Sequence, residues 1–168
     1  MLIIFGGLPG TGKTTIARQV AKHLNAAYLR IDTVEQVLKN LNNANELIGP
    51  EGYLISYAIA KDNLMLDMNV VADSVNPIQV TRQDWQQVAK TANKRFIEIE
   101  LFCSNADEHQ KRVESRVADI VGQNLPTWQD VLERDYELWE SRAVKVDTTK
   151  YSIVESVQLI LDYIKQVS

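Results

Sequence analysis

Cysteine and histidine are scarce in this chain of 168 residues, which has one cysteine and two histidines. The single cysteine, Cys103, excludes an internal disulfide framework and a cysteine-ligated metal cluster. Because Cys103 follows an apolar stretch at 96–102, we expect it to be a small buried residue. His23 and His109 have no metal-ligand partners at suitable spacing, so we expect both to be ordinary helix residues.

Long apolar runs and an excess of basic residues are also missing. No run of about 18 apolar residues is present, which predicts no membrane helix. The amino-terminal residues do not have the pattern of a signal peptide, and we expect a cytoplasmic protein. The net charge is −4, which disfavours a polymeric nucleic acid as partner but leaves open a short nucleic-acid end in a local pocket. The length suits one domain over 1–168, and the oligomeric state stays open.

Glycine is rare overall but concentrated near the amino terminus, where Gly6, Gly7, Gly10 and Gly12 lie within "FGGLPGTGKTT" at 5–15. Apolar, β-prone residues precede this stretch and a helical pattern follows it. The spacing Gly-x-x-x-x-Gly-Lys-Thr is that of a phosphate-binding loop, whose backbone N–H groups and helix N-terminus surround an anion. A glycine turn with a chance lysine is the alternative. We expect the nucleotide to be bound by Gly7, Leu8, Pro9, Gly10, Thr11, Gly12, Lys13, Thr14 and Thr15.

Strand and helix patterns alternate along the chain, which predicts an α/β fold with a parallel sheet between helices on both faces. Strands are predicted at 2–5, 27–31, 70–73, 95–102 and 144–147, and residues 53–68 have the pattern of a largely buried helix. Capping boxes are predicted at four helix starts, namely Thr33 with Gln36, Ser104 with Asp107, Thr127 with Asp130, and Ser152 with Glu155.

Three of the predicted strands end in an aspartate, at Asp32, Asp73 and Asp147. Ligands of parallel sheets lie beyond the carboxyl ends of the strands, so these carboxylates are candidates for the site. Asp73 ends an apolar strand as a Walker B aspartate does, and with Thr14 it is our candidate ligand of Mg²⁺. Ser74 follows it where many ATP hydrolases have a glutamate, which argues against a dedicated hydrolase.

Asp32 and Arg30 are the candidate acceptor-binding residues after the second strand. Asp32 suits a general base that accepts the proton of an attacking hydroxyl, and the alternative is a cap on a helix beginning near Thr33. Arg30 is either a ligand of an anionic substrate or a solvated strand residue.

A lid is predicted at about 106–142, in a segment that begins with a basic helix. Arg112 and Arg116 are one helical turn apart, where they would stabilise the charge that develops on a transferred phosphoryl group. The alternative is a solvated face on which Glu108 pairs with Arg112. The loop that follows is long enough to close over a nucleotide and exclude water.

Five segments together, "GLPGTGKT", "RID", "VVADSVNP…TRQDW", "EHQKRVESR" and "LPTWQDV", resemble small P-loop kinases of the zeta-toxin, chloramphenicol phosphotransferase and polynucleotide-kinase-like group, including bacterial AAA-family ATP-binding proteins. The resemblance covers nearly the whole chain. It implies a three-layer P-loop NTPase fold with strand order 2-3-1-4-5, ATP as the phosphoryl donor, and a hydroxyl compound as acceptor. It also implies roles for Asp32 as base, Arg112 and Arg116 as lid arginines, Asn76 and Arg82 at the substrate, and Asp147 and Thr148 beside the adenine.

A small-molecule kinase is therefore the expected function, with three alternatives. One is a regulatory nucleotide switch, whose GTPase form is disfavoured because "NKRF" at 93–96 fails the guanine-binding pattern at its last position and "DIVG" at 119–122, although it has the Asp-x-x-Gly form, follows a helix rather than the third strand. A toxin-like kinase and a nucleic-acid 5′-hydroxyl kinase are the others, and the second is weakened by the small number of basic residues. The identity of the acceptor is not readable from the residues.

Overall fold

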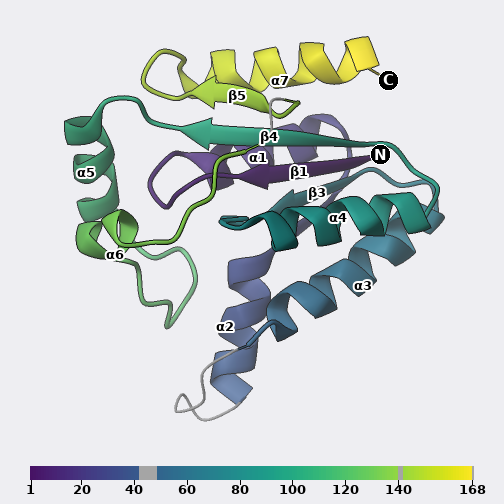
Figure 1. The fold of residues 1–168 in the computed structure, drawn as a ribbon, viewed down its shortest axis with the longest axis horizontal. Helices are drawn as coiled ribbons and strands as arrows, with labels where there is room; N and C mark the ends of the chain where they lie inside the picture. Colours follow the sequence, from purple (N-terminus) through teal and green to yellow (C-terminus); the bar gives the residue numbers. More distant parts are fainter. Residues whose placement is uncertain (42–48, 140–141, 168) are drawn as a thin grey trace.

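The computed structural model describes residues 1–41, 49–139 and 142–167. Five parallel strands form one sheet in the order β2-β3-β1-β4-β5 (Figure 1). Their bounds are β1 Leu2–Gly6, β2 Ala27–Arg30, β3 Val70–Asp73, β4 Phe96–Phe102 and β5 Val144–Asp147. The α/β class, the five strands and the strand order are all confirmed.

Helices cover both faces of the sheet and extend beyond the carboxyl ends of its strands. Their bounds are α1 Lys13–His23, α2 Ile31–Leu41, α3 Glu51–Met65, α4 Gln79–Thr91, α5 Ala106–Glu114, α6 Trp128–Leu132 and α7 Ile153–Val167. Helices α1 and α7 pack on one face through a core around Phe5 and Ile160, and α3 and α4 pack on the other around Ile4 and Trp85. Figure 1 shows α5 and α6 beyond the arrowheads of β1 and β4.

Strand β1 occupies the centre of the sheet because its side chains are apolar on both faces. Ile3 and Phe5 belong to one core cluster and Leu2 and Ile4 to the other, and all four are fully buried. A strand with apolar residues on both faces is stable only with helices on both sides, as parallel sheets require. This strand carries the glycine-rich loop directly at its carboxyl end.

Two of the four predicted capping boxes are confirmed and two are wrong. Those at Thr127 and Ser152 form, with their hydroxyl groups accepting hydrogen bonds from the backbone N–H groups of Asp130 and Glu155. Helix α5 is instead capped by Asn105, one residue later than predicted. Helix α2 begins at Ile31, so Thr33 is already inside it. The connection between β2 and α2 is therefore shorter than the sequence predicted, because α2 follows Arg30 directly.

Helix α3 is also more exposed than predicted. Its residues are apolar around most of the helix, but only one face, with Gly52, Ser56, Ala60 and Leu64, is buried. Leu54 remains 58% exposed on the opposite side. Apolar composition alone therefore misjudged how many sides of this helix are covered. Among the described residues, no helix is long and apolar enough to cross a membrane.

Candidate active site

The glycine-rich loop joins β1 to α1 with a backbone that favours glycine. Gly10 and Gly12 both have φ near +84°, and a Cβ on Gly10 would lie 2.5 Å from Cγ2 of Val113. Helix α1 starts at Lys13 with no side chain capping its first N–H groups and no acidic residue in its first turn. These unpaired N–H groups and the positive end of the helix dipole suit a phosphate group.

Lys13 and Asp73 form a buried ion pair beside this loop. The Nζ of Lys13 lies 2.8 Å from Oδ1 of Asp73, and the hydroxyl of Tyr28 donates to Oδ2 at 2.6 Å. Burial alone would raise the pKa of Asp73, but the charge of Lys13 and the hydrogen bonds outweigh it, so the pKa is lowered. Asp73 is therefore ionised, as a metal ligand must be.

The residues present fit a magnesium–nucleotide complex. Asp73 and Thr14 offer two hard oxygen ligands, and Mg²⁺ prefers few protein ligands together with water and phosphate oxygens. The described residues contain no group of three or more His, Cys, Asp or Glu side chains placed to hold a metal by themselves. Thr14 and Lys13 both line the cavity described next.

A cavity of about 930 Å³ opens above the carboxyl ends of the strands. Its walls combine the glycine-rich loop with the first turn of α2, the start of α3, the segment after β3 and the lid. Of the predicted site residues, it is lined by Leu8, Pro9, Gly10, Gly12, Lys13, Thr14, Thr15, Arg30, Asp32, Arg112, Arg116 and Thr148. The structure thus brings the predicted phosphate loop, base and lid arginines to one space.

Asp32 lies in the first turn of α2 with its side chain 33% exposed, and it lines the cavity. Because the helix begins at Ile31, Asp32 is not at the capping position that was its alternative role. Glu35, one turn further, lines the same cavity. Burial first, and then the nearby charge of Asp32, raise the pKa of Glu35.

Arg30 is almost completely buried, contrary to the alternative of a solvated strand residue. One of its terminal nitrogens donates to Asp119 at 2.8 Å, and the other lies 3.5 Å from Asp32. Arg18 donates to the same oxygen of Asp119 at 2.7 Å. The hydrogen bond from Arg30, followed by that from Arg18, lowers the pKa of Asp119 to about 2.

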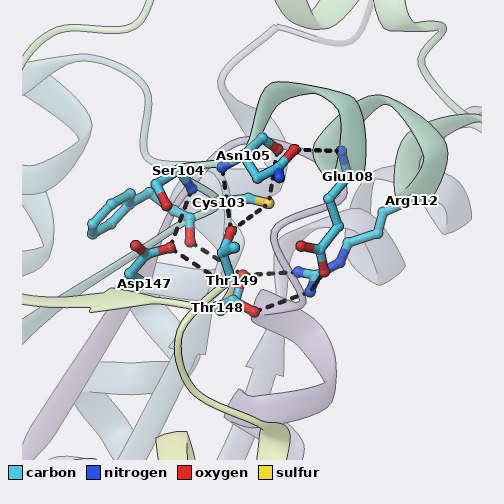
Figure 2. Close-up of polar contacts among 9 residues, drawn as sticks. Cys103, Ser104, Asn105, Glu108, Arg112, Asp147, Thr148 and Thr149 are labelled. Carbon is cyan, nitrogen blue, oxygen red and sulfur yellow. Dashed lines mark hydrogen bonds and ion pairs between the residues drawn. The ribbon is translucent and has the colours of Figure 1, made fainter.

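Helix α5 is fixed to the end of β5 through Arg112 (Figure 2). The Arg112 guanidinium donates to the hydroxyl and the carbonyl oxygen of Thr148, at 2.9 and 3.0 Å, and pairs with Glu108. The predicted Glu108–Arg112 pair therefore forms, yet Arg112 also lines the cavity. Arg116 lines it as well and has no hydrogen bond to any other described residue.

Asp147 stabilises this junction between α5 and the end of β5, and it does not line the cavity. Its carboxylate accepts hydrogen bonds from the backbone N–H groups of Ser104 and Thr149, both at 3.1 Å. Figure 2 shows these contacts joining the chain after β4 to the chain after β5. Of the two residues predicted beside the adenine, only Thr148 faces the cavity. Gly7 and Thr11 are likewise buried within the glycine-rich loop.

Asn76 and Arg82, predicted at the substrate, lie outside the cavity and hold the backbone. The side-chain amide of Asn76 donates to the carbonyl oxygen of Phe5 at 2.7 Å. Arg82 is buried, and its Nε donates to the carbonyl oxygen of Asn76 at 2.9 Å. The loose Asn-Pro…Arg pattern therefore marks a structural network in this chain.

Three residues at the site escaped the sequence analysis. Tyr28 carries no motif and Asp119 was considered only as part of an Asp-x-x-Gly pattern, so only the three-dimensional arrangement brings them to Asp73 and Arg30. His109 is buried, and its Nε2 lies 2.7 Å from the carbonyl oxygen of Pro9. In the sequence, only its spacing of one helical turn from Val113, which lies against Gly10, could have indicated that His109 faces the glycine-rich loop.

The segment "NKRF" at 93–96 lies between α4 and the start of β4. It is therefore at the amino end of the sheet, whereas the glycine-rich loop follows the carboxyl end of the neighbouring parallel strand β1. A guanine base bound near the loop would be at the opposite end of the sheet. This placement is a second argument, beside its last residue, against "NKRF" as a guanine-binding motif.

A family model described as an AAA domain matches residues 2–134, which is most of the chain. The chain belongs to this AAA-domain family. The narrower likeness to the zeta-toxin, chloramphenicol phosphotransferase and polynucleotide-kinase-like group stays a prediction.

Solved structures share the fold of this AAA-domain chain at low identity. The Chaetomium thermophilum Kti12 in complex with ADP-AlF3 superposes with a TM-score of 0.73 at 20% identity, over 99% of this chain and 98% of that one. A gluconokinase from Sinorhizobium meliloti gives 0.68 at 19%, over 98% and 91%. The Mycobacterium tuberculosis APS kinase CysC, in complex with AMPPNP and APS, gives 0.66 at 18%, over 98% and 96%. The chain therefore has the fold of P-loop kinases.

Proposed function

We propose that this protein is a Mg²⁺- and ATP-dependent phosphotransferase that phosphorylates a hydroxyl group of a small molecule. The observation that carries the proposal is that Asp32 and the glycine-rich loop line one cavity. A carboxylate placed opposite a phosphate-binding loop can accept the proton of an attacking hydroxyl. The similarity in fold to a gluconokinase and an APS kinase supports the same reading.

ATP supplies the transferable γ-phosphoryl group when it is bound. The loop N–H groups and Lys13 hold its phosphates, while Thr14 and Asp73 hold Mg²⁺. Asp32 accepts the hydroxyl proton as the acceptor oxygen bonds to the γ-phosphorus and the bond to the β-phosphate oxygen breaks. Arg112 and Arg116 stabilise the negative charge on the equatorial oxygens.

The other predictions join this proposal. Residues 1–168 form a single domain whose lid, at about 106–142, excludes water during transfer. Thr148 borders the nucleotide base, and Asn76, Arg82 and Asp147 support the site without contacting ligands. We expect the protein to act in the cytoplasm on a small molecule rather than on polymeric nucleic acid, given its net charge of −4.

The test is ADP formation from Mg·ATP by the wild type, Asp32→Asn and the matched control Asp62→Asn, whose carboxylate is exposed on α3. The acceptor panel contains sugars, sugar acids, nucleosides, aminoglycosides, phenicols and 5′-hydroxyl oligonucleotides. We expect one class to accelerate ADP formation, and Asp32→Asn to lower that rate at least about 100-fold, the usual contribution of a general base. ATP binding should stay within about twofold of wild type.

Two results would contradict the proposal. Full transfer by Asp32→Asn would remove Asp32 as the base. Slow hydrolysis that no acceptor accelerates, unchanged in both variants, would favour a regulatory nucleotide switch.

A further inference from the structure

The cavity is strongly basic although the whole chain is acidic. Among the residues that the structure describes, seven cationic side chains line it, against the three carboxylates of Asp32, Glu35 and Asp119. The cations are Lys13, Arg18, Arg30, Lys39, Arg112, Arg116 and Arg134. After Lys13, Arg112 and Arg116 are assigned to the triphosphate, four cations remain. A cavity of this sign concentrates anions beyond the nucleotide itself.

Arg30 is the most deeply buried of the four remaining cations. Its side chain is 3% exposed, and its Nε is a buried donor with no partner among the described residues. One terminal nitrogen contacts Asp119, and the other is 3.5 Å from Asp32, at the limit of a hydrogen bond. A buried guanidinium requires an anionic partner, and a planar fork of donors suits a carboxylate or phosphate.

Asp119 supplies that partner from the irregular chain between α5 and α6. Arg18 and Arg30, from two different elements, converge on a single oxygen of its carboxylate. Side chains of Asp119 and Arg18 are 42% and 49% exposed. The exposed Arg18–Asp119 pair contributes little to stability, and an incoming anion that replaced Asp119 beside the buried Arg30 would still give that guanidinium an anionic partner, so such an anion can compete with Asp119 for both arginines.

We propose that Arg30 and Arg18 form an anion subsite for the acceptor, which the Asp119 carboxylate fills until an anionic group of the acceptor displaces it. This inference rests on the proposed function and names its substrate class. The acceptor is a hydroxy compound that carries a carboxylate or a phosphate monoester. Because one guanidinium approaches both Asp32 and Asp119, the reactive hydroxyl and the anionic group lie within a few bonds of each other.

Direct binding tests this subsite without requiring phosphoryl transfer. The full chain is saturated with Mg²⁺ and AMPPNP, so that the phosphate loop is already filled, and titrated calorimetrically. One set of probes is glycerate, glycerol phosphate and glycerol; the second is gluconate, sorbitol phosphate and sorbitol. Each set compares a carboxylate, a phosphate and no charge on one carbon scaffold.

The variants are Asp119→Asn, Arg30→Gln, Arg30→Lys and the control Asp62→Asn. Asp119→Asn removes the internal competitor and should tighten anion binding about fivefold, whereas Arg30→Gln should weaken it at least about tenfold. Arg30→Lys keeps the charge but loses the planar fork of donors, so its affinity for the anions should lie between that of wild type and that of Arg30→Gln. The control should match wild type. If Arg30→Gln fails to fold, Arg30→Lys and the exposed Asp119→Asn still decide the question.

Neutral compounds that bind as tightly as the anions would overturn the proposal. So would unchanged anion binding in Asp119→Asn, or no anion binding to that variant. The carboxylate and phosphate arms report which anionic group the subsite prefers. Anion binding that depends on Arg30 without any ADP formation would leave the subsite standing and refute the kinase. Phosphoryl transfer to a neutral acceptor, at a rate that does not change in the Arg30 and Asp119 variants, would leave the kinase standing and refute the subsite.

Discussion

Replacing Arg82 by glutamine should destabilise the protein rather than impair substrate binding. The guanidinium donates four hydrogen bonds to backbone carbonyl oxygens, of Asn76 and Leu138 at 2.9 Å, Pro77 at 2.8 Å and Glu137 at 2.6 Å. Among the described residues, no ion pair involves Arg82, and burial lowers its pKa. All its stabilising contacts therefore come from carbonyl groups and from the rings beside it.

Each hydrogen bond from a charged donor contributes about 1.5 to 3 kcal/mol, and such contributions are not additive. The guanidinium also lies 4.4 Å from the centre of the Trp139 ring, which adds about 1 kcal/mol. Glutamine can restore one or two of the four bonds. We therefore expect Arg82→Gln to lower the free energy of unfolding by about 3 to 5 kcal/mol, a large part of the usual total.

Urea unfolding followed by circular dichroism measures this loss. With an m-value of about 2 kcal/mol per molar, the midpoint should fall by about 2 M. Gln83→Ala, at the exposed neighbouring position of α4, is the control and should change stability by less than about 0.5 kcal/mol. A midpoint for Arg82→Gln equal to that of the control, together with a raised KM for the acceptor, would refute the structural role and restore the predicted substrate contact.

Two further predictions concern the root of the glycine-rich loop. A Cβ on Gly6 would lie 1.9 Å from Cζ2 of Trp139. Gly6→Ala should therefore lower the free energy of unfolding, measured by thermal unfolding, by about 1 to 3 kcal/mol, and by less in a Trp139→Leu background. Equal losses in both backgrounds would show that the clash is not the cause. The lowered pKa of Asp73 contributes stability above the ordinary carboxyl pKa of about 4, and this is lost as the pH falls through the lowered value. Lys13→Met removes the main opposing charge, so burial raises the pKa of Asp73, and the variant should lose stability relative to wild type as the pH rises from the ordinary carboxyl pKa of about 4 towards neutrality. A constant difference between the two urea midpoints across that range would contradict this.

The sheet was predictable because its signal is local. Strand β1 is a continuous apolar run, which predicts a buried strand. The glycine-rich loop has a fixed residue spacing, which predicts both its backbone conformation and a phosphate group as its ligand. The position of Asp32 at the cavity also followed from its place directly after a strand. The start of α2 did not, because a helix can begin directly at Ile31 without a capping side chain when the preceding strand fixes the chain direction.

The remaining parts of the site depend on contacts between distant residues. Asp119 meets Arg30 across 89 positions of sequence, and although Arg30 was a predicted acceptor-binding residue, nothing in the sequence pairs it with Asp119. Arg82 illustrates the opposite case, because a familiar pattern placed it at the substrate whereas in the structure it donates to four backbone carbonyl oxygens. The exposed side of α3 has a similar cause, since apolar composition does not state how many neighbours a helix has.

The segment that we predict to be a lid is attached to the rest of the chain at both of its ends. Arg112 and the loop around Asp147 fix its beginning to β5, and Arg82 fixes residues 137 and 138 near its end to the chain after β3. A flap anchored at two points has one easy motion, a rotation about the line that joins them. Asp119, near its middle, adds a third attachment through Arg18 and Arg30, so this rotation requires the release of Asp119 from both arginines. Lengthening the irregular chain at 115–127 would therefore change the swing of the flap and leave the sheet undisturbed.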